Sequence, residues 1–215
     1  MKSHDFQNHV IKIFVHRLML FQLLFLILCI TCQKEKGPPI DFFKEDITIE
    51  IEEGRLRVTG IYFFKNLTSN RIRVNFYYPF PVDVNHHYPD TIAMSRSYEE
   101  NSSGINFTML FNPKDIASFH IMYEQRISKN QCTYITTTTR KWERPIKEAH
   151  FTIIIPDTLS AIISYPLSHS AKINNKHHHY ITIQSFFPKE DLMIEWTRNS
   201  QHNNLEPDCI RKSSS

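Results

Sequence analysis

The chain has 215 residues, with 25 Lys and Arg against 22 Asp and Glu, and its formal net charge is +3. Hydrophobic residues make up 41% and charged residues 22%, which is ordinary for a globular protein and excludes a disordered or low-complexity chain. Part of the small positive charge lies in the N-terminal segment. The composition therefore does not point to nucleic-acid binding, and we expect no nucleic-acid partner.

The first predicted element is an export signal. Residues 18–30 read LMLFQLLFLILCI, and Lys12, His16 and Arg17 stand just before them. A basic start followed by a short apolar core is typical of a secretory signal. The core is shorter than the roughly 20 apolar residues that span a bilayer. An ordinary cleaved signal and an uncleaved anchor that reaches back to Val10 are the two alternatives to a lipid anchor.

The end of this segment predicts a lipid anchor. Residues 29–32 read CITC and resemble a bacterial lipobox, the signal whose final cysteine is lipidated, although Cys29 stands where leucine is common. The resemblance implies that Cys32 carries the lipid. We therefore expect 1–32 to be the signal and 33–40 to be a proline-containing linker. The protein would be held at the membrane on the extracytoplasmic side of the cell envelope, either periplasmic or at the outer surface.

Two cysteines follow the signal, Cys132 and Cys209. An even number of cysteines in an oxidising compartment allows a disulfide, which would tie the polar C-terminal tail, residues 198–215, to the domain. Two independent thiols are the alternative, because sequence does not show that the two residues are close in space.

A hairpin is the most specific local prediction. Isoleucines alternate with polar residues over 46–52, as in a half-buried strand, and residues 55–58 alternate in the same way. Glu53 and Gly54 between them predict a two-residue turn. The expected pairs on the polar face are Glu52–Arg55 and Glu50–Arg57. Those on the apolar face are Ile51–Leu56 and Ile49–Val58.

The rest of the body also consists of predicted strands. Gly60 interrupts the alternation of the second hairpin strand, which indicates a β-bulge. No later segment has a sustained 3.6-residue period with helix caps. The sequence therefore predicts one all-β domain over residues 41–197, an antiparallel two-sheet β-sandwich of immunoglobulin-like architecture. The further strand candidates are residues 72–78, 92–98, 105–111, 116–127, 132–139, 151–155, 161–165, 180–187 and 192–196.

Four motifs carry a resemblance to known proteins. They are Gly60-x-Tyr62-x-Phe64-x-Asn66, Phe80-Pro81, Tyr123-Glu124-Gln125 and Trp142-x-x-Pro145. Over residues 47–196 the pattern is similar to exported bacterial lipoproteins with a β-sandwich domain of unknown function. Its first part also resembles the vault protein and inter-alpha-trypsin inhibitor domain, in which an F-x-N strand precedes a strand ending in F-P-x-P. The resemblance implies a β-sandwich and assigns no catalytic residues.

Two groups of histidines are candidates for metal binding. His177, His178 and His179 follow Asn174-Asn175-Lys176, which indicates a hairpin tip. Imidazole binds zinc, copper and nickel, but neighbouring residues on a strand point to opposite faces. We therefore interpret the three histidines as a weak metal candidate in a solvated loop.

The second group contains His86 and His87, which lie near Asp83 and Asp90 in another predicted loop. A metal site or an acid–base pair is the functional interpretation of these residues. A solvated loop is the simpler one, and we adopt it.

The sequence predicts no catalytic residues and no cofactor. It lacks a G-x-S-x-G motif, and its four glycines are too few for a nucleophile elbow or a phosphate cradle. Among the aromatic residues, Tyr77 alternates with Phe76 and Tyr78. We therefore expect Tyr77 on the surface, where an exposed aromatic patch could contact a protein partner.

The function that these observations favour is a membrane-anchored, non-enzymatic interaction or adaptor module. The alternative is an exported enzyme of the cell envelope whose catalytic residues come from distant loops. A concave pocket that holds carboxylates or histidines with perturbed pKa values would favour the enzyme.

Overall fold

The computed structural model describes residues 38–199. The predicted signal, Cys32 and Cys209 lie outside these residues. Within them the chain forms thirteen β-strands and one short 3-10 helix, so the prediction of a mostly β protein is confirmed. In this described part, no helix has the length and apolar character needed to cross a bilayer.

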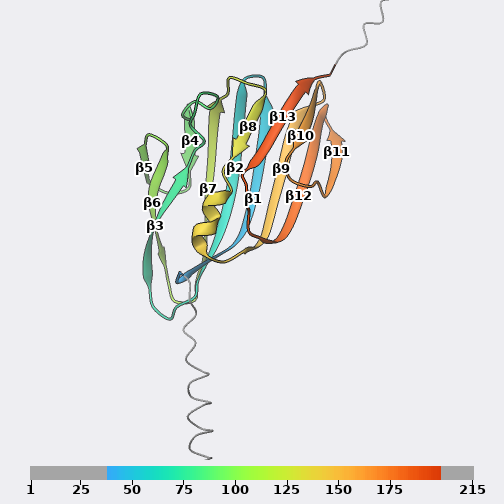
Figure 1. The fold of residues 1–215 in the computed structure, drawn as a ribbon. Coiled ribbons are helices and arrows are strands. Elements are labelled where there is room, and N and C mark those ends of the chain that lie inside the picture. The colour runs from blue at the N-terminus through green and yellow to red at the C-terminus, as the bar shows by residue number, and fades with distance from the viewer. Residues whose placement is uncertain (1–37, 200–215) are drawn as a thin grey trace, which may run out of the picture. The chain divides into compact units, whose positions relative to one another are not determined.

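The largest sheet has seven strands in the order β11-β12-β9-β1-β2-β7-β4 (Figure 1). β1 and β9 run parallel, and the other neighbours in this sheet pair antiparallel. The strands are β1 (Ile40–Glu52), β2 (Arg55–Asn66), β4 (Thr91–Met94), β7 (Ile116–Arg126), β9 (Ile146–Pro156), β11 (His169–Ile173) and β12 (Lys176–Phe186).

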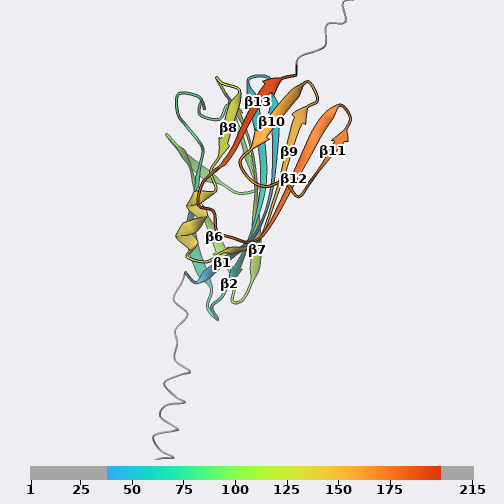
Figure 2. The same ribbon diagram turned by 45° about the vertical axis from the view of Figure 1, so that its right-hand side comes forward.

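Two three-stranded sheets complete the fold. Their orders are β3-β6-β5 and β10-β13-β8. Figures 1 and 2 place β8, β13 and the helix η1 on the same side of the large sheet. The remaining elements are β3 (Ile72–Pro79), β5 (Tyr98–Asn101), β6 (Gly104–Phe111), β8 (Gln131–Tyr134), η1 (Thr137–Trp142), β10 (Leu159–Ile163) and β13 (Leu192–Arg198).

Both small sheets pack against the large one through aromatic rings. The rings of Phe64 on β2 and Phe76 on β3 are 5.0 Å apart between centroids. The rings of Tyr134 on β8 and Phe151 on β9 are 6.1 Å apart. Burial of these large side chains is the main source of stability in such a core.

The predicted β1–β2 hairpin is confirmed in its register, and its apolar pairs are buried. The charged face differs at both of its predicted ion pairs. Glu124 on β7 lies 2.5 Å from Arg57 and 3.9 Å from Arg55, in place of the expected Glu50 and Glu52. Because β2 has a neighbour on each side, Arg57 lies between acidic residues of two strands, and the hairpin alone did not reveal the second.

The predicted bulge at Gly60 is wrong. Gly60 pairs regularly with Ile47, and the register shift lies between Phe42 and Lys44 on β1. A side-chain carbon on Gly60 would lie 2.5 Å from the Tyr62 hydroxyl. Gly60 is therefore needed because the Tyr62 side chain folds back along the strand over it.

Two other strand predictions need correction. Residues 92–98 do not form one strand, because β4 pairs with β7 in the large sheet while β5 pairs with β6. The strand expected over 132–139 ends at Tyr134. The backbone N–H groups of Thr136 and Thr137 both donate to Asp191 Oδ1, at 2.9 Å each, and the chain then enters η1.

Candidate functional site

The core face of β1 contains a carboxyl group. The alternation that buries the isoleucines of residues 47–51 also brings Glu45 onto that face, where it is 2% exposed. Phe42 faces the core as well, three residues earlier. The register shift after Phe42 accounts for this odd spacing. The shift inserts one extra residue into β1, and without it the alternation from Phe42 would place Lys44 in the core. Lys44 is instead half-buried, with its Nζ 3.3 Å from Asp46 Oδ2.

Three tyrosine hydroxyls meet beside Glu45. Tyr62, which is opposite Glu45 in the β1–β2 register, has its hydroxyl 2.9 Å from that of Tyr78 and 2.6 Å from that of Tyr134. The three residues come from β2, β3 and β8, one from each sheet. Burial raises the pKa of each phenol well above its ordinary value. All three therefore stay protonated at neutral pH.

A cavity of about 320 Å³ adjoins these groups, and Glu45 and the three tyrosines are part of its wall. Thr138 and the exposed Lys141 of η1 also border it. Most of the remaining wall is aromatic, which makes the cavity apolar around a few convergent polar groups. The other aromatic rings of the wall are Phe42, Phe64, Phe76, Tyr77, Phe107, Phe119 and Trp142. We call this space the aromatic cavity.

Glu45 is the electrostatically unusual group of the aromatic cavity. Burial, with a smaller contribution from the charge of Asp46, raises the pKa of Glu45 from 4.5 to about 8. Its Oε1 atom is buried and has no hydrogen-bond partner. A buried polar atom without a partner is uncommon in proteins. A perturbed carboxyl beside a cavity is a candidate functional group.

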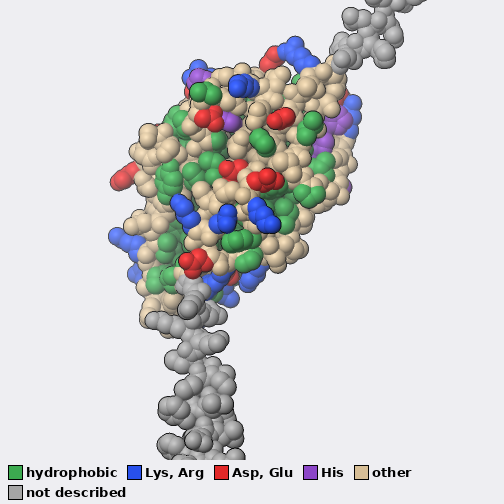
Figure 3. Space-filling view, in the orientation of Figure 1, with side chains coloured by type: hydrophobic (Ala, Val, Ile, Leu, Met, Phe, Trp, Pro, Cys, Tyr) green, Lys and Arg blue, Asp and Glu red, His purple; other side chains and the backbone are tan. Residues whose placement is uncertain are grey.

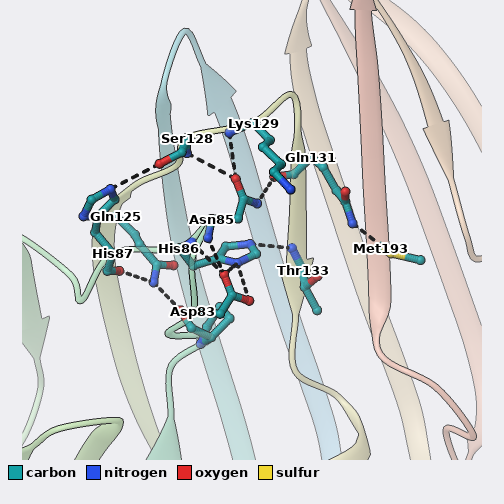
Figure 4. A network of polar contacts seen from close by, with 11 residues as sticks. Asp83, Asn85, His86, His87, Gln125, Ser128, Lys129, Gln131, Thr133 and Met193 are labelled. Carbon is teal, nitrogen blue, oxygen red and sulfur yellow. Dashed lines mark hydrogen bonds and ion pairs between the residues drawn. The ribbon is translucent and has the colours of Figure 1, made fainter.

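His86 also lies in the core rather than in a solvated loop, so that interpretation is wrong. It is 2% exposed, and its Nδ1 lies 3.0 Å from Asp83 Oδ1. The backbone N–H of Thr133 donates to its Nε2 at 3.1 Å (Figure 4). This network assigns the proton to Nδ1, which donates to Asp83. Both ring nitrogens are occupied, so His86 has no nitrogen left for a metal ion or for proton transfer.

Asn85, the residue before His86, is also bonded through both ends of its side-chain amide. The Asn85 side chain donates to the backbone carbonyl of Gln131 at 2.8 Å and accepts from the backbone N–H of Lys129 at 2.7 Å. Asp90 forms its ion pair with Arg126, at 3.0 Å, and not with His86. These bonds tie the β3–β4 connection to the β7–β8 connection, which is a structural role. We call this group the His86 network.

The three adjacent histidines lie on β12, so the prediction of a loop is wrong here too. The turn before them is made by Asn174 and Asn175, both with positive φ. The rings of His177 and His179 lie 6.2 Å apart on one face, while His178 lies 6.3 Å from Tyr180.

The space-filling view shows histidine side chains along the edge of the domain near β11 and β12 (Figure 3). Burial, together with the charges of His177 and His178, lowers the pKa of His179. Among residues 38–199, no group of three or more His, Cys, Asp or Glu side chains is close enough together to hold a metal ion.

Two further sequence predictions concern Cys132 and Tyr77. Cys132 is 1% exposed, and burial raises the pKa of its thiol to about 12, so it is not a reactive thiolate. Its bond to Cys209 stays a prediction, because Cys209 lies outside the described residues. Tyr77 is 46% exposed, as predicted, while Phe76 and Tyr78 are buried.

Comparisons with known proteins bear on the fold only. A family described as Domain of unknown function (DUF4424) matches residues 117–194, which is less than half of the chain. None of the curated proteins matches the sequence.

A crystal structure from Legionella pneumophila, provisionally described as a nutrient binding protein, is 13% identical with a TM-score of 0.61; the match covers 74% of this chain and 67% of that one. An M1 zinc metallopeptidase from Deinococcus radiodurans is 11% identical with a TM-score of 0.47, and this chain spans only 43% of its length.

Proposed function

We propose that this chain is an exported, membrane-anchored and non-enzymatic binding protein of the cell envelope, and that it binds a small molecule in the aromatic cavity. One observation carries the proposal: a buried carboxyl and three tyrosine hydroxyls converge on an apolar cavity of about 320 Å³. This volume and this lining are typical of small-molecule sites. Export and lipidation at Cys32 are supported by the sequence of residues 18–32. The nutrient-binding description of the Legionella protein agrees with the proposal, but the likeness concerns the fold alone.

The architecture gives a reason for a cavity at this position. We propose that the β3-β6-β5 and β10-β13-β8 sheets together act as the second layer of a sandwich on the seven-stranded sheet. These two small sheets are not hydrogen-bonded to each other. Residues of β3, β6, β8 and η1 line the aromatic cavity, which therefore lies at the gap in that layer. A second layer split in two leaves space that side chains do not fill.

An exported enzyme is the second candidate, and one observation favours it. Glu45 is a carboxyl with a pKa of about 8 beside a cavity, which suits a general acid. The tyrosines hold their protons too tightly to act as the partner base at neutral pH. Among the residues that line the cavity, Glu45 is the only carboxyl. Binding without turnover therefore fits the site better.

The experiment uses Trp142 as a reporter, because it lines the cavity. The other tryptophan, Trp196, is replaced by phenylalanine. Full-length protein in detergent is titrated with benzyl alcohol, a neutral aromatic probe. We expect a saturable change in fluorescence. Thr138→Phe, which places a ring in the cavity wall, should abolish it.

Thr91→Phe is the matched control, because Thr91 is exposed on β4 away from the cavity. It should leave the titration unchanged and corrects for partitioning of the probe into micelles. A response that Thr138→Phe does not alter, or no saturable response at all, would exclude the aromatic cavity as a binding site. Consumption of the bound ligand, followed by mass spectrometry, would identify an enzyme instead.

A further inference from the structure

We infer that the ligand of the aromatic cavity is a small organic ammonium ion and that Glu45 is its counter-ion. This inference rests on the proposed function and adds the charge and chemical class of the ligand. It starts from geometry: Glu45 is 2% exposed, borders the cavity, and has an oxygen without a hydrogen-bond partner. Within the described protein this oxygen lacks a partner, and the Glu45 side chain borders the space that a ligand would occupy.

Among residues 38–199, no cationic side chain contributes to the electrostatics of this carboxyl. Among the lining residues, the one basic side chain is Lys141, which is exposed and does not contribute to the electrostatics of Glu45. An ionised carboxylate in an apolar site needs a partner of opposite charge. A cationic ligand would supply it. Aromatic rings around the site would add attraction, because a ring attracts a cation to its face.

Other classes of ligand fit the cavity less well. An anion would find no buried cationic partner in the wall, and its charge would oppose ionisation of Glu45. A hard metal cation needs six or more oxygen ligands, whereas the wall offers one carboxyl and a few hydroxyls. A neutral molecule could form a hydrogen bond with the carboxyl, but it would not supply the positive charge that the ionised form lacks. An alkylated ammonium combines a single positive charge with an apolar surface, which matches both features of the wall.

Binding of a cation must couple to loss of the proton from Glu45. The titratable groups that face Glu45 are Tyr62, Tyr78 and Tyr134 in the wall, Tyr165 nearby and Asp46 on its own strand. The four tyrosines remain protonated below pH 9, so Glu45 is the group that releases a proton. Because its pKa is about 8, affinity for a cation should rise about tenfold per pH unit from pH 6 to pH 8 and then level off.

Choline and 3,3-dimethylbutan-1-ol make the decisive pair of probes, because they have the same shape and differ in charge. Each is titrated into the full-length Trp196→Phe protein at pH 6, 7, 8 and 9 with Trp142 as the reporter. We expect choline to bind at least tenfold more tightly than the neutral alcohol at pH 8. Glu45→Gln should remove this preference, and Glu99→Gln, which changes an exposed carboxyl, should retain it.

The outcomes separate this inference from the proposed function. Equal affinity of the Trp196→Phe protein for the two probes would overturn the inference. A choline affinity that does not change with pH would also overturn it. Neither conclusion depends on how the Glu45 and Glu99 variants behave. Failure of choline to bind while benzyl alcohol binds would also overturn it and would leave the proposed function in place. Failure of all three probes would overturn both.

Discussion

The His86 network and the aromatic cavity both contain buried polar side chains, and they differ in how completely their atoms are bonded. In the His86 network, both nitrogens of the buried imidazole have partners, Asp83 on one side and the backbone of Thr133 on the other. In the aromatic cavity, the tyrosine hydroxyls are bonded to each other, but Glu45 Oε1 has no partner. His86 and Glu45 are equally buried, at 2% exposure each, so burial alone does not separate them.

The difference lies in what each arrangement leaves available. A fully bonded polar network fixes one conformation and has no atom left for a ligand. A buried carboxyl without a partner destabilises the folded state, and such a group is retained where a ligand or a reaction uses it. The comparison supports a structural role for the His86 network and the functional role that we propose for Glu45.

The largest expected change in stability comes from a substitution in the His86 network. His86→Ala removes the imidazole and leaves the Asp83 carboxylate and the Thr133 N–H without their partner. We expect the free energy of unfolding to fall by about 3 kcal/mol, from the cavity and the lost hydrogen bonds together. Urea unfolding followed by circular dichroism measures this. His87→Ala is the control, because His87 is exposed, and it should change stability by less than about 0.5 kcal/mol.

A His86→Ala protein as stable as its control would show that the network does not hold the two connections together. His86 would then have to be reconsidered as a functional residue.

Glu45→Gln tests the aromatic cavity, and we expect it to raise the free energy of unfolding where His86→Ala lowers it. The pKa of Glu45 is about 8 in the folded protein and 4.5 in the unfolded chain, so the folded state holds the proton more tightly. Stability of the unmodified protein should therefore fall as the pH rises from 4.5 to 8. The variant has no such proton, so it should be more stable by about 2 kcal/mol at pH 9 and by little at pH 4.5.

Urea unfolding at pH 4.5, 7 and 9 measures this difference, with Glu99→Gln as the control for loss of an exposed carboxyl. A gain that is the same at all three pH values would mean that Glu45 is not the group whose ionisation opposes folding. A loss of stability at pH 9 would mean that the carboxylate is bonded in the folded state. Either result would remove the contrast between the two groups.

Much of the fold could be predicted from the sequence because it depends on alternation. The period of two over residues 46–58 fixed both the β1–β2 register and its buried face, and the structure has the same pairs. The prediction failed where local pattern and tertiary contact differ. Asp191 lies far from Thr136 in the sequence, yet its carboxylate accepts from the backbone there and ends β8. No local pattern contains that bond.

The candidate site was missed for a related reason. Extending the alternation of residues 47–51 back by two positions places Glu45 in the core, so one signal for it was present. The tyrosines are different, because Tyr62, Tyr78 and Tyr134 come from three sheets and meet only in the folded domain. The sequence shows that such residues are core aromatics but not which hydroxyls meet.

The smallest expected effect concerns the bonded part of the aromatic cavity. Tyr62→Phe removes the central hydroxyl, so the hydroxyls of Tyr78 and Tyr134 each lose a partner while the ring still packs over Gly60. We expect a loss of about 1 kcal/mol at pH 7, because each net hydrogen bond is modest and cavity water can replace part of it. Tyr78→Phe removes only one of the two bonds and should lose less. The two variants are compared by urea unfolding. If Tyr62→Phe were no less stable than Tyr78→Phe, the hydroxyls would be bonded to water rather than to each other, and Glu45 would then share that water instead of standing without a partner.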